Sequence, residues 1–396
     1  MKKAAKKHLP QGKTLFFFFL SALLLVFSLS VVVSSYLNGS DLIRERFVAA
    51  ALSDFFHKPA RFITAEDLET VRAVKLTDTT VSFGGEDIIV GLRKNHSLEV
   101  TDTASLLDLD EYYHTVTLKT RLENVEFLAL FDHLEYLSVY NCAAVRSLED
   151  VSAFENLYEL EYWNEGQNIA SLDALKGLSD LRVLTVAHST LADVDALSAL
   201  PSILRLNLAG NEIADISALS ALTNLRVLSM PQNRVQSLEP LKELTSLQYL
   251  DVSDNQVTSL VPLSGLTDLR QLTVSNTKDA EKAENNVISL EPLSGMKKLL
   301  FLYCDNNPSV SLMGLDALER LSAASFNACN LKDASAFAGL KKLNYLSVTE
   351  NELTDVSSLK ALSALRYLYV AGNDALDETE LKEAFSGVFV DVLSEE

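Results

Sequence analysis

The stretch LRVLSMPQNRV, residues 225 to 235, decides the fold of this chain. Leu225, Leu228 and Met230 are spaced too tightly to share one face of a helix. Leu228 and Met230 alternate as strand residues do, so both side chains point to one side while their neighbours point to the other. Asn233 follows where the chain turns, and Val235 is apolar again. The stretch therefore predicts a short strand that ends in a turn.

This phrase returns along most of the chain, usually at intervals of 22 residues. LQYLDVSDNQV begins at Leu247, and LNYLSVTENEL begins at Leu343. The spacing is 23 and 24 around Leu157 and 30 before Leu299. The copies, of which the first is weak, begin at Tyr113, Leu134, Leu157, Leu181, Ile203, Leu225, Leu247, Leu269, Leu299, Leu321, Leu343 and Leu365. Twelve copies are too many for chance, so residues 113–375 form an array of repeats.

The second half of each unit has a different pattern. Ile216, Leu219 and Leu222 place apolar residues three apart, which suits one or two turns of 3₁₀ or α-helix. Prolines open three of these turns, at positions where a missing N–H costs nothing: Pro240, Pro262 and Pro292. A single unit cannot bury its own leucines, whereas stacked units cover both faces of each other. The repeats therefore predict a solenoid.

The motif LxxLxLxxNxL at this period is the leucine-rich repeat signature. Residues 113–375 resemble the 22-residue class of bacterial leucine-rich repeat proteins, of which internalins are the best-known surface members. The resemblance implies an α/β solenoid shaped as a horseshoe, with a parallel β-sheet on the concave face and short 3₁₀ or α turns on the convex face. No immunoglobulin-like domain or wall-sorting signal is evident after the repeats, so the resemblance predicts the fold and not an invasion function.

The ninth position of the motif predicts a structural ladder. An asparagine amide there can bond backbone groups of the bend, both in its own coil and in the next. We expect six asparagines to stack in this way: Asn211, Asn233, Asn255, Asn307, Asn351 and Asn373. Cys142 and Cys329 occupy the same position in their copies. Eight coils would separate these two cysteines by roughly 40 Å, so they are not expected to form a disulfide. Cys304 is also expected to be a free, structural thiol.

Residues 15–37 are uncharged and long enough for a membrane-spanning helix of about 20 residues. Lysines precede this segment, and positive charge stays on the cytoplasmic side. We therefore expect a cytoplasmic basic leader at 1–14, a signal anchor at 15–37 and export of everything after Asp41. A cleaved signal peptide is the alternative, although the apolar core of such peptides usually runs to about 7–15 residues.

Both ends of a solenoid expose leucines and need caps. We assign residues 41–112 to an N-terminal cap, with a helix at 42–58 and strand-motif spacing at Val71, Val74 and Leu76. We assign residues 376–396 to a C-terminal cap.

Within the C-terminal cap, Asp377 and Glu380 resemble a capping box, which predicts a helix over 378–385. Val390 and Val392 lie 22 residues beyond the matching positions of the previous strand and predict a last partial strand. The charged insertion at 277–286 is expected to form an exposed loop, with a binding protrusion as the alternative.

Charge excludes nucleic acid as a partner. The formal net charge is −20, and the five lysines of the leader are the only charged residues before Asp41, which leaves about −25 on residues 41–396. Such a body repels phosphates and anionic lipid headgroups.

Nothing in the sequence predicts catalysis, a cofactor or a metal. The six histidines show no metal-ligand spacing, and the chain has no GxSxG, HExxH or phosphate-binding glycine loop. Residues 107–111 and 251–254 are acidic but lack the glycine and the terminal glutamate of a calcium loop.

The candidate binding residues are those at outward-facing strand positions on the concave side. Exposed aromatic residues with flanking charge are typical of protein-binding hot spots. Lateral packing of these side chains on one another is the alternative. The set is Tyr136, Tyr140, Glu161, Trp163, Arg205, Tyr249, Phe301, Tyr303, Tyr345, Tyr367 and Tyr369, with Trp163 as the expected anchor.

The sequence thus predicts a membrane-anchored, extracytoplasmic recognition protein whose concave face binds a protein or a cell-surface ligand such as a cell-wall glycan. A scaffold or regulatory subunit of a membrane complex is one alternative, and a protein secreted after signal cleavage is another.

Overall fold

The computed structural model forms two units, Met1–Thr64 and Ala65–Glu396, and the repeats lie in the second. The residues that it describes are 50, 52, 53, 55–59, 62–77, 80–85, 114–117, 126–142, 145, 147–163, 169–277 and 285–392. The predicted leader at 1–14 and the predicted anchor at 15–37 lie outside these residues, as does most of the helix expected at 42–58.

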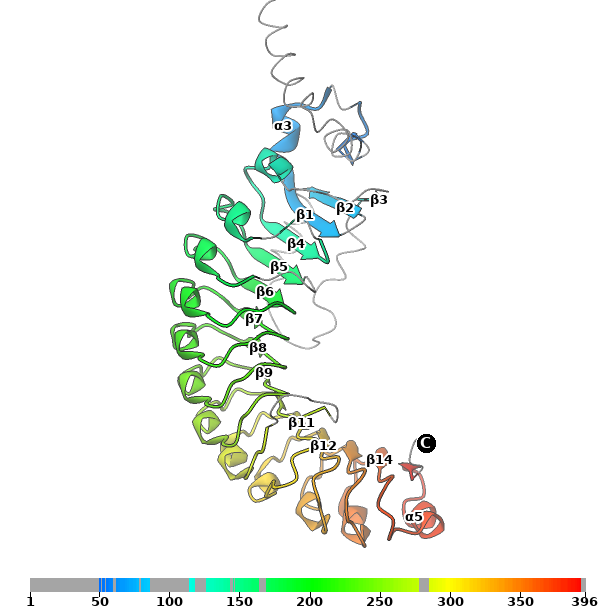
Figure 1. The fold of residues 1–396 in the computed structure, drawn as a ribbon. Coiled ribbons are helices and arrows are strands. Elements are labelled where there is room, and N and C mark those ends of the chain that lie inside the picture. The colour runs from blue at the N-terminus through cyan, green and yellow to red at the C-terminus, as the bar shows by residue number, and fades with distance from the viewer. Residues whose placement is uncertain are drawn as a thin grey trace, which may run out of the picture. The chain divides into compact units, whose positions relative to one another are not determined.

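The repeats form a curved solenoid, which confirms the predicted α/β solenoid with its parallel sheet and short 3₁₀ turns. Its strands line the inner side of the curve and its 3₁₀ turns line the outer side (Figure 1). Eleven parallel strands come from consecutive coils: β4 (Tyr136–Tyr140), β5 (Glu159–Trp163), β6 (Val183–Ala187), β7 (Arg205–Asn207), β8 (Val227–Ser229), β9 (Tyr249–Asp251), β10 (Gln271–Thr273), β11 (Phe301–Tyr303), β12 (Ala323–Ser325), β13 (Tyr345–Ser347) and β14 (Tyr367–Tyr369).

Short 3₁₀ turns return the chain along the convex side. They are η3 (Glu126–Leu130), η4 (Glu149–Val151), η5 (Asp173–Leu175), η6 (Asp195–Ala199), η7 (Ser217–Ala221), η8 (Glu239–Leu241), η9 (Val261–Leu263), η10 (Glu291–Gly295), η11 (Leu315–Ala317), η12 (Ser335–Phe337) and η13 (Ser357–Ala361). As expected, Pro240, Pro262 and Pro292 stand in the first turn of η8, η9 and η10.

The core is a stack of aliphatic layers shared between coils. Leu206, Leu228 and Leu250 are register partners on β7, β8 and β9, and none has more than 1% of its surface exposed. Met230 and Val252, two residues further along, are fully buried as well. Each inward side chain therefore packs against its counterparts in the coils before and after it.

A ladder of asparagine side chains runs beside this core. The Asn233 Oδ1 accepts a hydrogen bond from the backbone N–H of Ile213 at 3.0 Å. Its Nδ2 donates to the carbonyl oxygens of Leu208 at 2.9 Å and Met230 at 3.1 Å. One amide thus satisfies backbone groups of its own coil and of the preceding one. The same pattern repeats at Asn211, Asn255, Asn307, Asn351 and Asn373.

The insertion contributes a ladder residue that the sequence did not reveal. Residues 278–284 lie outside the described part of the chain, but the two flanks of the insertion are joined. The backbone N–H of Asn285 donates to Asn276 Oδ1 at 2.9 Å, and Asn276 Nδ2 donates back to the Asn285 carbonyl at 2.9 Å. Asn285 Oδ1 then accepts from the backbone N–H of Val257 at 2.8 Å, as a ladder asparagine does.

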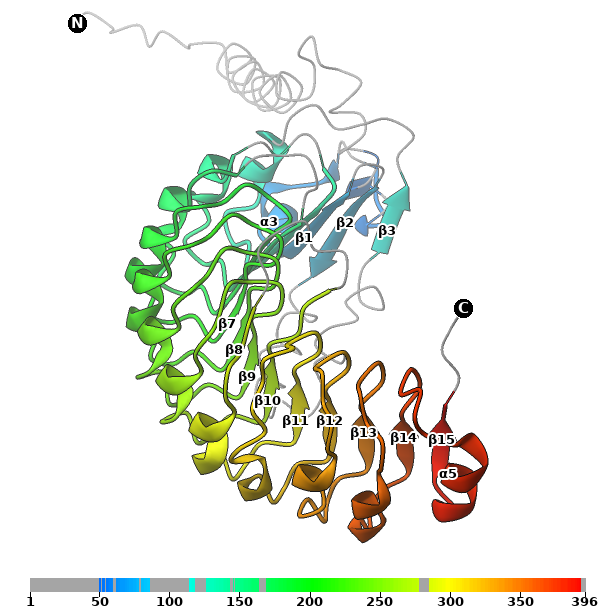
Figure 2. The same ribbon diagram turned by 60° about the horizontal axis from the view of Figure 1, so that its bottom comes forward.

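The N-terminal edge of the sheet differs from one sequence prediction. β1 (Val71–Thr77) is parallel to β4 and adds a strand like those of the repeats. The short helix α3 (Ala65–Leu68) precedes β1 in the chain. Beyond β1 the sheet continues with β2 (Thr80–Gly85) and β3 (His114–Thr117), each antiparallel to the strand before it (Figure 2). The weak copy beginning at Tyr113 is therefore not a coil of the solenoid. Alternating apolar residues suit either strand direction, so the pattern alone does not distinguish them.

The C-terminal edge follows the sequence prediction. The Asp377 side chain accepts a hydrogen bond from the backbone N–H of Glu380 at 2.9 Å and caps α5 (Glu378–Ala384). β15 (Phe389–Asp391) then pairs in parallel with β14, with Val390 opposite Leu368. In the described residues, no helix combines the length and apolar character needed to cross a bilayer.

Replacing Asn233 with alanine tests the ladder. The substitution leaves the buried backbone N–H of Ile213 without its partner and removes the hydrogen bonds that Asn233 donates to Leu208 and Met230, so we expect a loss of about 2–4 kcal/mol in the free energy of unfolding. Urea denaturation of the variant measures this loss. Gln236→Ala is the matched control, because Gln236 also bonds an adjacent coil, through Gln256 at 2.9 Å, but on an exposed surface. Equal effects of the two substitutions would contradict a structural role for the ladder.

Candidate functional site

The concave face carries two rows of outward-facing side chains fixed by the strand register. In one row Tyr136, Glu159, Val183 and Arg205 are successive partners across β4, β5, β6 and β7. In the other row, two residues further along each strand, Ser138, Glu161, Thr185 and Asn207 are partners. Because adjacent strands lie about 4.8 Å apart, each row sets polar groups at short, regular intervals.

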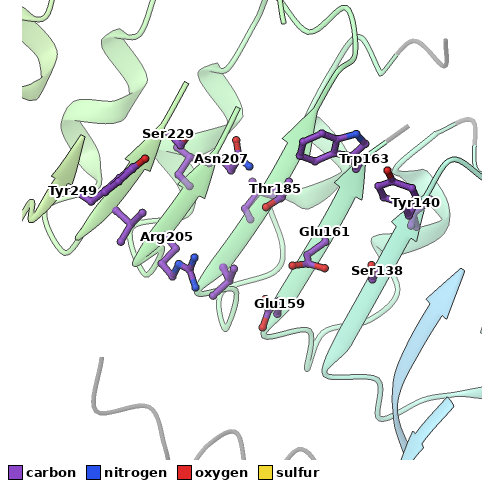
Figure 3. A pocket seen from close by; sticks show the side chains of 15 residues that line it. Ser138, Tyr140, Glu159, Glu161, Trp163, Thr185, Arg205, Asn207, Ser229 and Tyr249 are labelled. Carbon is purple, nitrogen blue, oxygen red and sulfur yellow. The ribbon is translucent and has the colours of Figure 1, made fainter. Parts of the chain in front are cut away.

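A hollow of about 310 Å³ opens on this face between β4 and β9 (Figure 3). Five of the residues predicted for partner binding line it: Tyr140, Glu161, Trp163, Arg205 and Tyr249. Its floor and sides also include Ser138, Val139, Glu159, Val183, Leu184, Thr185, Leu206, Asn207, Val227 and Ser229. The hollow is thus mixed in character, with carboxylates, a guanidinium, hydroxyls and aromatic rings on one surface.

Two carboxylates stand at one end of the hollow. Glu159 is only 4% exposed, and burial, reinforced by the nearby Glu161, raises its pKa to about 8. Glu161 is half-buried, and its Oε2 accepts a hydrogen bond from the hydroxyl of Tyr136 at 2.7 Å. Tyr136 itself is 3% exposed, so it holds Glu161 in position instead of offering a surface to a partner.

Arg205 faces the carboxylates from β7. Burial lowers the pKa of its guanidinium, while the charges of Glu159 and Glu161 raise it. It makes no ion pair with either glutamate within the described chain, and its buried Nε has no hydrogen-bond partner. Val183 stands between Glu159 and Arg205 in the row, which explains why the two charges attract each other without touching.

Aromatic rings form one rim of the hollow. The Trp163 ring stacks on Tyr140 with centroids 6.3 Å apart, and it packs against His188 with centroids 4.4 Å apart. Tyr140 remains 48% exposed. His188 follows β6 with a positive φ of 53°, and a Cβ on Gly210 would lie 2.7 Å from its Nδ1. Glycine at 210 therefore leaves the space in which His188 supports Trp163.

A second aromatic cluster lies at the C-terminal end of the same face. Tyr345 and Tyr369 pack with centroids 5.2 Å apart, and Phe389 on β15 contacts Tyr369 and Tyr367 at 5.8 and 6.2 Å. Tyr367 is 47% exposed and Phe389 is 55% exposed. Packing and exposure thus occur together: the rings contact one another and still present apolar surface.

Phe301 and Tyr303 on β11 are half-buried and lie between the hollow and the C-terminal cluster in strand order. His188 and Phe389 were not among the residues predicted for partner binding. Phe389 carried a detectable signal, since it lies 22 residues after Tyr367 at the same strand position.

The three cysteines are buried and unbridged. Burial raises the pKa of Cys329 to about 12 and that of Cys304 well above its usual value, so both are protonated thiols of low reactivity. The Cys329 thiol donates to the Cys304 carbonyl at 3.1 Å and so takes the place of a ladder asparagine. Within the described segments, no three histidine, cysteine or acidic side chains are grouped as a metal site would require.

The sequence model of a protein family described as "Leucine-rich repeat region" matches residues 133–390 of this chain. The chain belongs to the leucine-rich repeat family. That match covers every strand from β4 to β14 and the C-terminal cap as far as Val390. Comparison with curated proteins gave no match.

Solved structures share the fold of this leucine-rich repeat protein. An internalin, InlF of Listeria monocytogenes, is similar with a TM-score of 0.65 and 21% identity over 88% of each chain. The functional domain of InlJ from the same organism has a TM-score of 0.53 and 21% identity over 64% of this chain and 56% of that one. A leucine-rich repeat protein of Leptospira interrogans has a TM-score of 0.52 and 17% identity over 69% and 82%. The internalin resemblance is thereby confirmed at the level of the fold.

Replacing Glu159 with glutamine tests the cost of the buried carboxyl. Its pKa of about 8 in the folded chain lies above the 4.5 of a free glutamate, so the unfolded chain binds fewer protons between these values. Stability therefore falls as pH rises from about 4.5 to 8, and the variant escapes this loss. We expect Glu159→Gln to stabilise the protein by roughly 3 kcal/mol at pH 8 and by much less at pH 5.

Urea denaturation at the two pH values measures this difference. Glu243→Gln on the exposed convex side is the matched control and should change little at either pH. A gain in stability that is independent of pH would contradict the assignment.

Proposed function

We propose that this leucine-rich repeat protein is a recognition module whose concave face binds a protein or a cell-surface ligand. The observation that carries the proposal is the partial exposure of aromatic rings at both ends of the face. Tyr140 and Trp163 stand at one end, and Tyr367 and Phe389 stand at the other. Partly exposed aromatic residues that are already held by their neighbours lose little entropy on binding, which favours them as anchors.

We further propose that residues 15–37 anchor the protein in the membrane and that the repeats are displayed outside the cytoplasm. The support is the uncharged length of the segment and the lysines that precede it. The acidic body suits this arrangement, because a charge of about −25 on residues 41–396 keeps the repeats off an anionic lipid surface.

Substitution of the aromatic anchors tests recognition. In intact cells, crosslinking followed by quantitative mass spectrometry should recover a partner with the wild-type protein. Trp163→Ala and Tyr367→Ala should each reduce its yield at least about tenfold, as expected for hot-spot residues. Circular dichroism should show that both variants remain folded.

Val261→Ala is the matched control, since Val261 is 60% exposed on the convex turn η9. A control that loses the partner equally would point to another surface. Loss of the partner only when residues 15–37 are replaced by an unrelated apolar helix would favour a scaffold within a membrane complex.

Protease treatment of intact cells tests the topology. If the repeats are displayed outside, added protease should remove the protein from intact cells as completely as from lysed cells. Protection of the repeats in intact cells, with digestion after lysis, would contradict the proposed location. Release of the repeats into the medium without protease would favour cleavage of residues 15–37 as a signal peptide.

A further inference from the structure

The acidic end of the hollow contains a carboxyl group that the fold does not use. Glu159 lines the hollow and is 4% exposed, yet its carboxyl group has no hydrogen-bond partner among the described residues. Most buried polar side chains in proteins are hydrogen-bonded, and a buried carboxyl without a partner costs stability. An uncompensated group of this kind in a hollow is a candidate binding group.

Glu161 adds a second carboxylate that is held in place. It lies two residues further along the same strand, so both side chains face the hollow (Figure 3). The hydrogen bond from Tyr136 fixes its orientation and leaves its other oxygen free of any bond that the described residues provide. The two carboxyl groups therefore converge on one region of the surface.

Arg205 attracts these two carboxyl groups but does not contact them. It stands two strands away, which corresponds to roughly 10 Å between backbones, and Val183 separates it from Glu159. It forms no ion pair with either glutamate in the described structure. The Glu159–Glu161 region of the hollow thus carries two carboxyl groups that no cation of the described chain contacts.

We propose that the Glu159–Glu161 end of the hollow is a subsite for one basic side chain, lysine or arginine, of a protein partner. This rests on the proposed recognition function and names the chemistry of its ligand. An ammonium or guanidinium group is only a donor, so when bound it donates hydrogen bonds to both carboxyl groups. It thereby supplies the hydrogen-bond partner that Glu159 lacks.

The rim of the hollow suits the rest of such a side chain. Tyr140, which is 48% exposed, and the uncovered part of Trp163 offer aromatic surface for an aliphatic stem or for a cation–π contact. The net charge of about −25 on residues 41–396 also attracts basic partners to the protein as a whole. Shape, charge and the unsatisfied carboxyl therefore favour a cationic occupant.

Binding should be linked to proton release. Glu159 faces Glu161 on its own strand, Tyr136 on β4 and Arg205 on β7, while β6 presents only Val183 and Thr185. With its pKa at about 8, Glu159 is largely protonated at neutral pH, and a bound cation favours the ionised form. Affinity for a lysine probe should therefore rise as pH rises through about 8, where the lysine remains charged.

The chain offers a built-in reporter for the test. Trp163 is the only tryptophan and lines the hollow, so its fluorescence reports occupancy. The full-length protein in detergent micelles is titrated with acetyl-trilysine amide and with the uncharged acetyl-triglutamine amide. We expect saturable binding of trilysine only, at least about tenfold weaker in Glu159→Gln and in Glu161→Gln. The rise in affinity with pH should be absent from Glu159→Gln.

Glu243→Gln is the matched control, because it removes the same charge from the convex side. Equal weakening by this control would mean general attraction to an acidic protein and would overturn the subsite. Absence of saturable trilysine binding to the wild-type protein would overturn it as well. If the subsite fails while Trp163→Ala and Tyr367→Ala still lose the crosslinked partner, recognition by the concave face stands without it.

Discussion

The structure depends on one packing relation: the inward leucines of each coil are covered only by the coils on either side. Leu228 has no exposed surface because Leu206 and Leu250 lie against it in register. Beside these leucine layers, each ladder asparagine hydrogen-bonds backbone N–H and carbonyl groups of the preceding coil, as Asn233 does with Ile213 and Leu208. Stability therefore belongs to neighbouring pairs of coils and not to any coil alone.

This packing leaves the concave sheet free to carry groups that the fold does not need. All of the strands from β4 to β15 hold their partners in parallel, so the outward side chains stand in fixed rows. A rigid strand can hold Glu159 and Glu161 close together although negative charge on one disfavours negative charge on the other. The same rigidity keeps the rings of Tyr345, Tyr369 and Phe389 in contact while part of their surface remains open.

The repeat fold and most of the concave-face positions could be predicted from the sequence, because a period of 22 residues fixes which side chains are partners on adjacent strands. The inward pairs such as Leu228 and Met230 follow directly from alternation along a strand. Residues that depart from the 22-residue pattern could not be predicted from it. Asn285 joins the ladder from beyond an insertion, where counting by the period fails, and Tyr136 is buried although its position in the motif faces outward. The depth of Glu159 likewise depends on its neighbours and not on its place in the repeat.

Two hydrogen bonds join Asn276 and Asn285 across the insertion. The stack of coils is therefore continuous there whatever the length of the inserted segment. Asn285 resumes the ladder after the insertion, and β10 and β11 pair in register across it. A stack that keeps its register across an insertion tolerates inserted sequence of different length or composition during evolution. The insertion also marks the natural place to graft a foreign epitope or a fluorescent tag onto this scaffold without disturbing its layers.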